Sequence, residues 1–193
     1  MIIAVTNRHL CKGDFLEKIE QIAKAKPHAI LLREKDLPEN VYRKLAQNCN
    51  AICKIHSVQF IAHSFPRIAQ ELEIGIHLPF QYFQNEHLTG FQRLGASVHS
   101  AEEAILAVKR GANYLIAGHI FATDCKRGVD PRGLEFLQGV CKSVKMPVFA
   151  IGGISPLNVR DVMKSGAAGV CLMSGLMMSD QPDKEIDALR SDM

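Results

Sequence analysis

The chain has 193 residues, of which 47% are hydrophobic and 22% are charged, and its formal net charge is +3. That length suffices for a sizeable core, so we expect one domain over residues 1–193. The small charge, with no long basic run, argues against nucleic acid as a partner. No apolar run approaches the roughly 20 residues of a membrane span, and MIIAVTNRHL lacks the charged segment of a signal peptide. We therefore expect a cytoplasmic protein with no membrane partner.

Short apolar runs alternate with amphipathic segments along the whole chain. Each apolar run is expected to form a strand, and each amphipathic segment a helix. The predicted strands cover residues 2–7, 28–35, 59–64, 74–80, 93–99, 112–121, 147–153 and 169–175. The predicted helices cover residues 14–25, 38–55, 66–72, 101–111, 133–144 and 155–166, with a last helix in the tail. Residues 81–90 give only a weak signal.

Several predicted helices begin at a capping residue. Asp14 is placed to cap the first helix, and Ser100 with Glu103 forms a capping box before the helix over 101–111. In the helix over 155–166, Ser155 is the expected N-cap and Pro156 the first helical residue. These signals set the expected helix boundaries.

The order of the elements predicts the fold class. Strands that are each followed by a helix or a loop predict a parallel sheet, and eight such units predict one closed (β/α)8 TIM barrel. The alternative is a doubly wound open sheet, which more often has about five or six strands. In a barrel the functional site lies where the strands end, so polar residues at those ends are the candidates.

The last two predicted strands end in AIGGIS and LMSG. The loops at these two places commonly bind phosphate in a barrel. Glycine lets an anion approach the backbone, and N–H groups at a helix start point toward it. We predict that Gly152, Gly153, Ser174 and Gly175 bind phosphate; the alternative is that the glycines only turn the chain.

A histidine stands where the sixth predicted strand opens into the polar loop of GHIFATDCKRG, residues 118–128. His119 at this place could move a proton near neutral pH; the alternative is a packed or surface histidine. Thr123 and Lys126 could hold an acidic group of a substrate. Alternatively, Lys126 and Arg127 form a solvated face of the loop.

Two cations lie at the end of the second predicted strand. Arg33 and Lys35 are two residues apart and point the same way if the strand persists, which suits a carboxylate or a phosphate. The alternative is that Lys35 lies in a loop and pairs with Glu34 or Asp36. Ser97, near the end of the fifth strand, is a further candidate for substrate binding.

Three histidines raise the question of a metal. Imidazoles of His63, His77 and His99 could converge on zinc from neighbouring strand ends. The sequence, however, contains no HxH or HExxH motif and no carboxylate companion nearby. We therefore predict no metal site.

The motifs LLREK, GASVHS, GANYLIAGHIFATDCKRG, PVFAIGGI and GAAGVCLMSG occur in the order seen in the thiamine phosphate synthase superfamily, and the resemblance covers nearly the whole chain. Two subgroups matter, the synthases themselves and the TenI-type thiazole tautomerases. The run GHIFATDCKRG, with PRG after it, resembles the TenI type more. Synthases typically have proline at the position of His119.

Other departures from the synthase pattern point the same way. Synthases usually carry Asn-Asp at the end of the third strand, where the Asp helps to bind magnesium, and this chain has Ala62 and His63. A second metal-binding Asp after the fourth strand is replaced by Tyr82, and a Gln of the second strand by Leu31. Magnesium pyrophosphate is thereby left with few ligands.

The resemblance implies a metal-independent thiazole tautomerase without a cofactor. Such an enzyme shifts a proton and aromatises an exocyclic thiazole carboxylate phosphate. His119 would be the base and acid, Thr123 and Lys126 would hold the loop or the carboxylate, and the glycines and serine of the last two loops would anchor the phosphate. The ligand would be a small-molecule thiazole phosphate, and the resemblance also suggests a homodimer.

Two alternatives remain at this point. One is a thiamine phosphate synthase, a transferase that joins a pyrimidine pyrophosphate to a thiazole phosphate; it would need magnesium, and the retained Arg33 and Lys35 favour it. The other is a non-catalytic sensor of a phosphate ligand on the same fold, which fold alone does not exclude.

Overall fold

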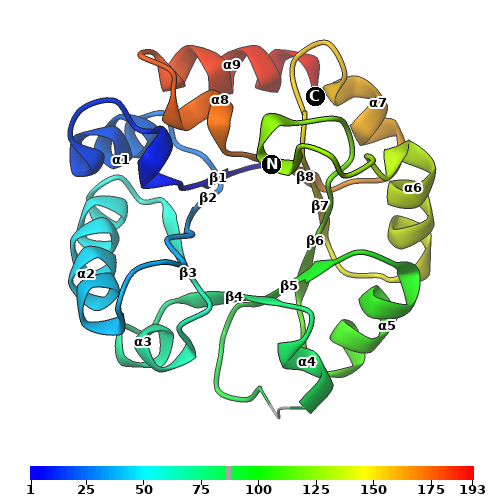
Figure 1. The fold of residues 1–193 in the computed structure, drawn as a ribbon, viewed down its shortest axis with the longest axis horizontal. Coiled ribbons are helices and arrows are strands. Elements are labelled where there is room, and N and C mark those ends of the chain that lie inside the picture. Colours follow the sequence, from blue (N-terminus) through cyan, green and yellow to red (C-terminus); the bar gives the residue numbers. More distant parts are fainter. Residues whose placement is uncertain (86–87) are drawn as a thin grey trace.

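A computed structural model describes residues 1–85 and 88–193 of the chain. Its described strands are all parallel and form a closed barrel in the order β1-β2-β3-β4-β5-β6-β7-β8 (Figure 1). The strands are β1 (Ile2–Val5), β2 (Ala29–Leu32), β3 (Gln59–His63), β4 (Gly75–Pro79), β5 (Leu94–Val98), β6 (Tyr114–Gly118), β7 (Val148–Ile151) and β8 (Gly169–Leu172). The predicted (β/α)8 barrel is confirmed, and the open-sheet alternative is wrong.

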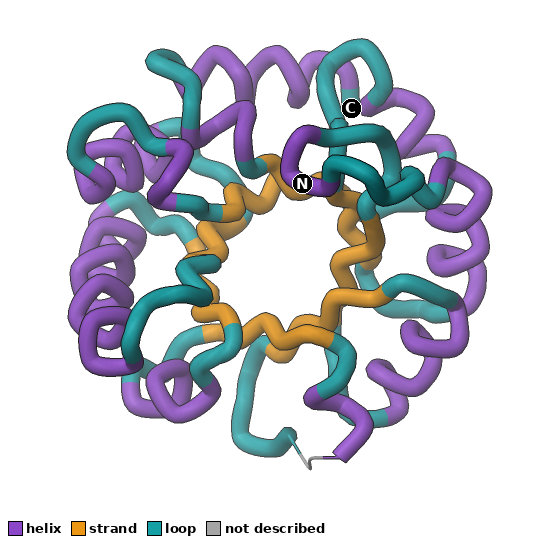
Figure 2. Tube along the Cα trace, viewed as in Figure 1, coloured by secondary structure: helices purple, strands orange, loops and turns teal. Residues whose placement is uncertain are grey.

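The helices surround the ring of strands (Figure 2). They are α1 (Phe15–Lys24), α2 (Glu39–Ile55), α3 (Pro66–Glu71), α4 (Tyr82–Asn85), α5 (Ala101–Lys109), α6 (Gly133–Ser143), α7 (Val159–Lys164), α8 (Ser174–Met177) and α9 (Pro182–Asp192), with short 3-10 turns η1 (Arg8–Leu10) and η2 (Asp124–Lys126). The weakly predicted segment over 81–90 begins with α4, and its residues 86–87 lie outside the described residues. In the described part of the chain, no helix is both long and apolar enough to cross a membrane.

Two of the predicted caps form as the sequence indicates. The Asp14 carboxylate accepts a hydrogen bond from the Glu17 N–H at 2.9 Å, which satisfies one free donor of the first turn of α1. The Ser100 hydroxyl accepts from the Glu103 N–H at 3.1 Å, and the Glu103 carboxylate accepts from the His99 N–H at 2.7 Å. The capping box therefore reaches one residue further back than the usual pattern.

The predicted start of the helix over 155–166 is wrong. Residues 155–158 form a turn, in which the Asn158 side chain accepts from the Ser155 N–H at 2.9 Å and donates to the Gly153 carbonyl at 2.9 Å. Asn158 thus takes the cap position, and Ser155 and Pro156 precede the helix.

The second predicted strand ends earlier than expected. It stops at Leu32, because the Arg33 N–H donates to the Thr6 hydroxyl at 3.0 Å instead of to a strand partner. The sixth predicted strand likewise ends at Gly118, which leaves His119 in the loop that follows. Both shorter strands place the candidate side chains on loops above the barrel end.

The barrel interior is packed with apolar side chains, and a second apolar shell lies between the strands and the helices. The inner cluster consists of Ile3, Val5, Ala29, Leu31, Ile61, Tyr114, Ile116, Phe149 and Cys171. Tyr114 and Phe149 meet edge to face, with ring centroids 6.1 Å apart. The barrel is therefore a filled core, as this fold requires, and a ligand binds at its end.

Gly95 makes room for two polar side chains inside the barrel. A Cβ at this residue would lie 2.1 Å from Cζ of Tyr114 and 2.5 Å from Nδ1 of His77. Only a residue without a side chain lets the phenol and the imidazole meet here.

Tyr42 of α2 holds the ends of β2 and β3 together. Its side chain is fully buried, its hydroxyl donates to the Leu32 carbonyl at 2.7 Å, and the same oxygen accepts from the His63 N–H at 2.9 Å. The phenol therefore satisfies two backbone groups at the place where the strands separate, and it fixes the positions of Arg33 and His63.

Replacement of Tyr42 by Phe is expected to lower the free energy of unfolding by about 1–3 kcal/mol, because two buried backbone groups lose their partner. Urea unfolding followed by circular dichroism measures this change. The matched control is Tyr82→Phe, because the Tyr82 side chain is only partly buried and forms no hydrogen bond with any described residue. An equal effect of the two substitutions would contradict the role of Tyr42.

Candidate functional site

A buried carboxylate organises the loops that follow β1 and β2. Glu34 is 2% exposed and accepts from the Thr6 hydroxyl at 2.6 Å and from the Arg8 N–H at 3.0 Å. The Arg8 guanidinium also pairs with this carboxylate at 3.1 Å. The sequence analysis considered Glu34 only as a partner of Lys35, whereas in the structure Glu34 anchors the two loops and has little capacity left for a ligand.

The neighbouring carboxylate, Asp36, is occupied in the same way. It pairs with the Arg8 guanidinium and lies 3.1 Å from Nε2 of His9. The hydrogen bond from Arg8 holds the pKa of Asp36 well below its usual range. The expected alternative, in which Lys35 pairs with Glu34 or Asp36, is therefore half right: Lys35 lies in a loop, but both carboxylates are bound to other residues.

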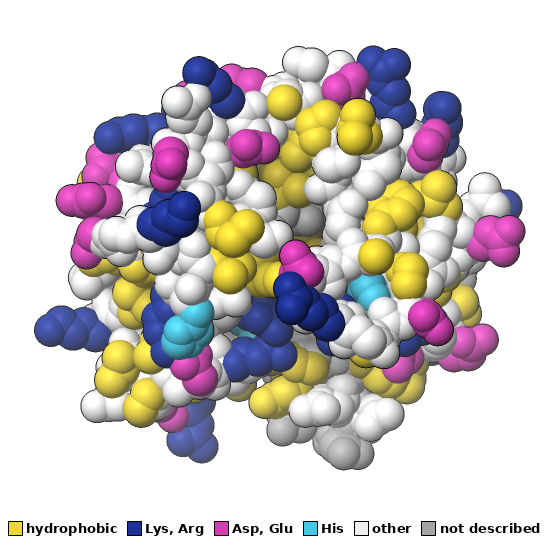
Figure 3. Space-filling model, turned by 45° about the horizontal axis from the view of Figure 1, so that its top comes forward, with side chains coloured by type: hydrophobic (Ala, Val, Ile, Leu, Met, Phe, Trp, Pro, Cys, Tyr) yellow, Lys and Arg dark blue, Asp and Glu magenta, His cyan; other side chains and the backbone are white. Residues whose placement is uncertain are grey.

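Three cations then remain together at this end of the barrel. Arg33 and Lys35 follow β2, Lys126 lies in η2, and none of the three forms an ion pair with any described residue. Although much of Lys35 is exposed, partial burial and the neighbouring charges of Arg33 and Lys126 lower its pKa. We call these three residues the cationic cluster. Lys and Arg side chains also lie together with His side chains in the central part of the face drawn in Figure 3.

A chain of polar side chains lies inside the barrel below the cationic cluster. His77 of β4 contacts the Tyr114 hydroxyl through Nδ1 at 3.1 Å and the Ser97 hydroxyl through Nε2 at 2.8 Å. His63 of β3 contacts Ser64 through Nδ1 at 2.6 Å, and its ring centroid lies 5.8 Å from that of His77. We call His63, His77, Ser97 and Tyr114 the lumen network.

The two histidines of the lumen network are neutral at physiological pH. Burial, together with the nearby His77, Lys35 and Arg33, lowers the pKa of His63 to about 2. Burial also lowers the pKa of His77 to about 3, again with Lys35 and Arg33 acting in the same direction. These imidazoles therefore act as hydrogen-bonding groups and not as charges.

The third histidine considered for a metal lies elsewhere. His99 is exposed, and its Nδ1 lies 3.3 Å from the Glu103 carboxylate. Within residues 1–85 and 88–193, no group of three or more His, Cys, Asp or Glu side chains is arranged to hold a metal ion.

His119 fastens the loop that follows it. The side chain is 8% exposed, and Nε2 lies 3.2 Å from the Val129 carbonyl oxygen. Its own carbonyl accepts from the Arg132 N–H at 3.0 Å. Ring and backbone thus hold the C-terminal part of the 122–132 loop against the start of that loop, a role that the strand-end position did not reveal.

The glycines after β7 lie against this loop. Gly152 has φ +102°, and a Cβ there would be 2.3 Å from Cβ of His119. Gly153 has φ +65°, and a Cβ there would be 2.5 Å from the Ala122 carbonyl oxygen. Close packing of two loops therefore accounts for both glycines, as the chain-turning alternative holds, and the phosphate site remains a prediction.

The other candidates occupy the same end of the barrel. Ser174 and Gly175 begin α8 directly after β8, and a Cβ at Gly175 would meet no atom within 4 Å. Thr123 precedes η2. Lys126 and Arg127 are both exposed, as the solvated-face alternative expects. Arg127 pairs with Asp124 at 3.1 Å, whereas Lys126 belongs to the cationic cluster.

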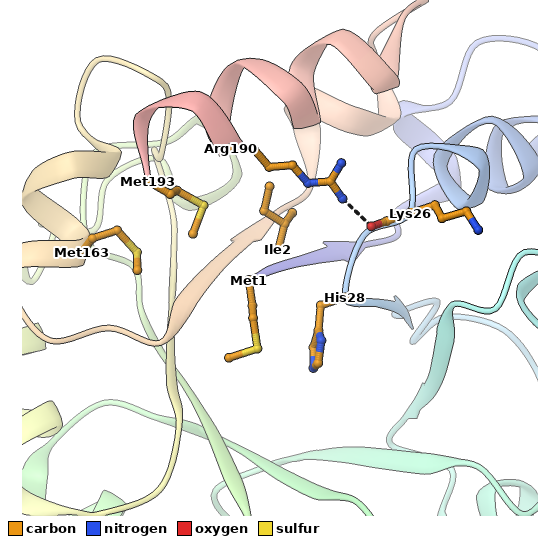
Figure 4. A pocket seen from close by; sticks show the side chains of 7 residues that line it. All are labelled: Met1, Ile2, Lys26, His28, Met163, Arg190 and Met193. Atoms are coloured by element: carbon orange, nitrogen blue, oxygen red, sulfur yellow. Dashed lines mark hydrogen bonds between the residues drawn. The ribbon is translucent and has the colours of Figure 1, made fainter.

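A cavity of about 450 Å³ lies at the opposite end of the barrel, where the strands begin (Figure 4). It is lined by Met1, Ile2, Lys26, His28, Met163, Arg190 and Met193. The Arg190 guanidinium there donates to the Lys26 carbonyl. Chemistry in this fold takes place at the carboxyl ends of the strands, and the other end serves stability, so the end with the cationic cluster is the candidate site.

Comparison with known proteins shows which class of protein this barrel belongs to. Residues 2–176 match the family described as "Thiamine monophosphate synthase". A thiamine-phosphate synthase of Fusobacterium nucleatum is 35% identical over 193 residues, which cover 96% of this chain and 93% of the relative. A thiamine-phosphate synthase of Pyrococcus furiosus is 45% identical over 97 residues, which cover 50% of this chain and 47% of the relative.

A solved structure agrees with these relatives. "Thiamine phosphate pyrophosphorylase" of Pyrococcus furiosus superposes with a TM-score of 0.85 at 29% identity, over 99% of this chain and 94% of that one. The chain belongs to the thiamine monophosphate synthase family. The resemblance to this superfamily that the motifs indicated is thereby confirmed.

The prediction of a thiazole tautomerase is wrong. The relatives, at up to 45% identity, are named as synthases, which are transferases and not isomerases. The structure adds that Nε2 of His119 lies 3.2 Å from the Val129 carbonyl oxygen, a contact that occupies one of the two ring nitrogens. The structure shows that His119 helps to attach a loop, and a catalytic role for this residue stays a prediction.

Replacement of Gly152 by Ala is expected to destabilise the protein by about 1–3 kcal/mol, because the added Cβ collides with His119 and the residue has a left-handed backbone. The control is Gly139→Ala in α6, where a Cβ would meet nothing within 4 Å. There alanine is expected to stabilise the helix by up to about 1 kcal/mol. Urea unfolding of both variants measures these changes. An unchanged unfolding midpoint for Gly152→Ala would refute the packing argument.

Proposed function

We propose that the protein is a thiamine-phosphate synthase, a transferase that joins a pyrimidine pyrophosphate to a thiazole phosphate and releases pyrophosphate. The single observation that carries this proposal is the cationic cluster of Arg33, Lys35 and Lys126, which has no ion-pair partner among the described residues. Both substrates are anions. The names of the relatives support the same reaction.

The reaction places its largest charge change on the leaving group. When the pyrimidine carbon leaves pyrophosphate for the thiazole nitrogen, the electron pair of the broken C–O bond stays on the pyrophosphate oxygen. Cations beside that oxygen stabilise the developing charge. Arg33 offers a rigid fork of donors for two phosphate oxygens, whereas Lys35 and Lys126 act as point charges.

The second substrate is assigned to the loops after β7 and β8. Gly152, Gly153, Ser174 and Gly175 lie at the carboxyl ends of those strands, where barrels commonly bind a phosphate group. Backbone N–H groups and the Ser174 hydroxyl would hold the thiazole phosphate, with the cationic cluster across the barrel end holding the pyrophosphate. Two separate anion sites are what a reaction between two phosphorylated substrates requires.

The lumen network supports a role for Ser97 in substrate binding. The Tyr114 hydroxyl is buried, and its only hydrogen-bond partner among the described residues is Nδ1 of His77, so the hydroxyl donates to that nitrogen. The neutral His77 then carries its proton on Nε2 and donates it to the Ser97 oxygen. The Ser97 hydroxyl proton is left free, and we assign it to a substrate oxygen at the barrel end.

The family pattern implies magnesium with the pyrophosphate, and the residues of this chain do not fit that ion. Magnesium prefers oxygen ligands, above all carboxylates. At the family's two metal-binding positions the chain has the buried, neutral His63 and Tyr82. In the proposed synthase reaction, the pyrophosphate is therefore assigned to the protein's own cationic side chains.

A direct assay tests the proposed function. Purified protein mixed with both substrates is expected to form thiamine phosphate and an equal amount of pyrophosphate, measured by chromatography and a colorimetric assay. Arg33→Ala should lower the rate about 10²-fold or more, because it removes a fixed charge from the leaving group. Arg67→Ala, an exposed arginine of α3, is the matched control and should leave the rate unchanged. No product with the wild type would refute the synthase.

The lowered pKa of Lys35 predicts a pH dependence of anion binding. Lys35 is charged below its pKa, so affinity for an anion is present at lower pH and is lost as the pH rises through that pKa, earlier than for an ordinary lysine. Inorganic phosphate is a suitable probe, because its charge is nearly constant above about pH 8. Calorimetric titrations at several pH values should show this fall, and Lys35→Arg should shift it to higher pH. An identical profile for the two proteins would contradict the assignment.

A further inference from the structure

We infer that the barrel end binds the diphosphate group directly through Arg33, Lys35 and Lys126, with no divalent cation between protein and phosphate. This inference rests on the proposed function, because it concerns how the diphosphate of that reaction is held. It differs from the family pattern, in which acidic side chains recruit a metal to the same group.

The first support is the balance of charge. A diphosphate monoester carries about three negative charges at neutral pH, and the cationic cluster supplies one positive charge from each of its three members. The charged groups that act on Lys35 are Arg33 and Lys126, which are both cations. A divalent cation placed here would be repelled by all three side chains, whereas an anion is attracted by all three.

The second support is the set of side chains at the positions where the family binds its metal. His63 is 4% exposed and lies beside His77, and its Nδ1 is engaged by the Ser64 hydroxyl at 2.6 Å. An imidazole is a poor ligand for magnesium. Ala62 has no ligand atom in its side chain, and Tyr82 has only a phenol.

The third support is the state of the nearby carboxylates. Glu34 is buried against Thr6 and Arg8, and Asp36 is also paired with Arg8. Asp124 pairs with an arginine of its own loop at 3.1 Å, and Asp130 is exposed in that loop. In the part of the chain that the structure describes, these acids do not form a metal-binding group with any His or Cys.

The position of the cations within the fold gives the fourth support. Arg33 and Lys35 follow β2 and Lys126 follows β6, so the cluster joins two loops from opposite parts of the barrel ring (Figure 1). Three like charges held near one another repel each other in the free protein, and a bound diphosphate removes this repulsion. The cluster is therefore arranged for an anion that spans both loops.

Calorimetric titration with inorganic pyrophosphate tests the inference. Binding is expected in buffer containing EDTA, and added magnesium should leave the affinity unchanged or weaken it several-fold, because the magnesium complex of pyrophosphate carries less negative charge. Binding that occurs only with magnesium, or that magnesium strengthens tenfold or more, would overturn the inference.

Two lysine variants show whether the cluster is responsible. Lys35→Ala is expected to weaken metal-free pyrophosphate binding at least tenfold. Lys44→Ala, which removes an exposed lysine of α2 outside any ion pair with the described residues, should change it less than twofold. Equal affinities of the two variants would overturn the assignment to the cluster. Both substitutions are at exposed positions, so loss of the fold does not confuse the comparison.

Measurements of pyrophosphate binding and of product formation on the wild-type protein test this inference and the proposed function separately. Product formation from both substrates that stops when EDTA is added would overturn the inference and leave the synthase standing. Metal-free pyrophosphate binding without any product would overturn the synthase and leave direct anion binding standing. Product formation that continues in EDTA supports both.

Discussion

The arrangement of the candidate site depends on the buried carboxylate of Glu34. This group collects the Thr6 hydroxyl, the Arg8 N–H and the Arg8 guanidinium, so the charge that a carboxylate would present to a ligand is already neutralised. A lone buried carboxylate is costly, whereas one with several donors is stable and holds its partners in place. Because Arg8 is engaged in this way with Glu34 and Asp36, the neighbouring Arg33 and Lys35 form no ion pair with any acid among residues 1–85 and 88–193.

The lumen network connects the barrel end that carries the cationic cluster to the apolar core. Tyr114 belongs to the apolar packing of the barrel interior, and its hydroxyl contacts His77, which in turn contacts the Ser97 hydroxyl. The absence of a side chain at Gly95 is a condition for the whole chain of contacts. Packing in the core and hydrogen bonding at the barrel end thus depend on each other, because they share Tyr114.

The sequence predicted the barrel well, because a parallel sheet buried on both faces leaves apolar runs that are easy to recognise, and Asp14 and Ser100 are strong capping residues. It predicted less of the site. Glu34 was missed because a buried carboxylate in a charged loop looks like any surface acid. The lumen network was missed because its members come from β3, β4, β5 and β6, and their contacts depend on the stagger of the strands. The contact of His119 was not predicted because its partner, Val129, lies ten residues away along a loop without periodicity.

The contact of Tyr42 with two strands has a mechanical consequence. The pairing of β2 with β3 ends at Leu32 and Ala62. Beyond this pair, the Tyr42 hydroxyl of α2 replaces a direct strand contact, because it bridges the Leu32 carbonyl and the His63 N–H. A helix side chain thereby acts as a spacer that decides how far the two strand ends diverge. The distance between the backbones at Leu32 and His63 is consequently set by the packing of a helix on the outside of the barrel, so we expect substitutions on the buried face of α2 to shift Arg33 and His63.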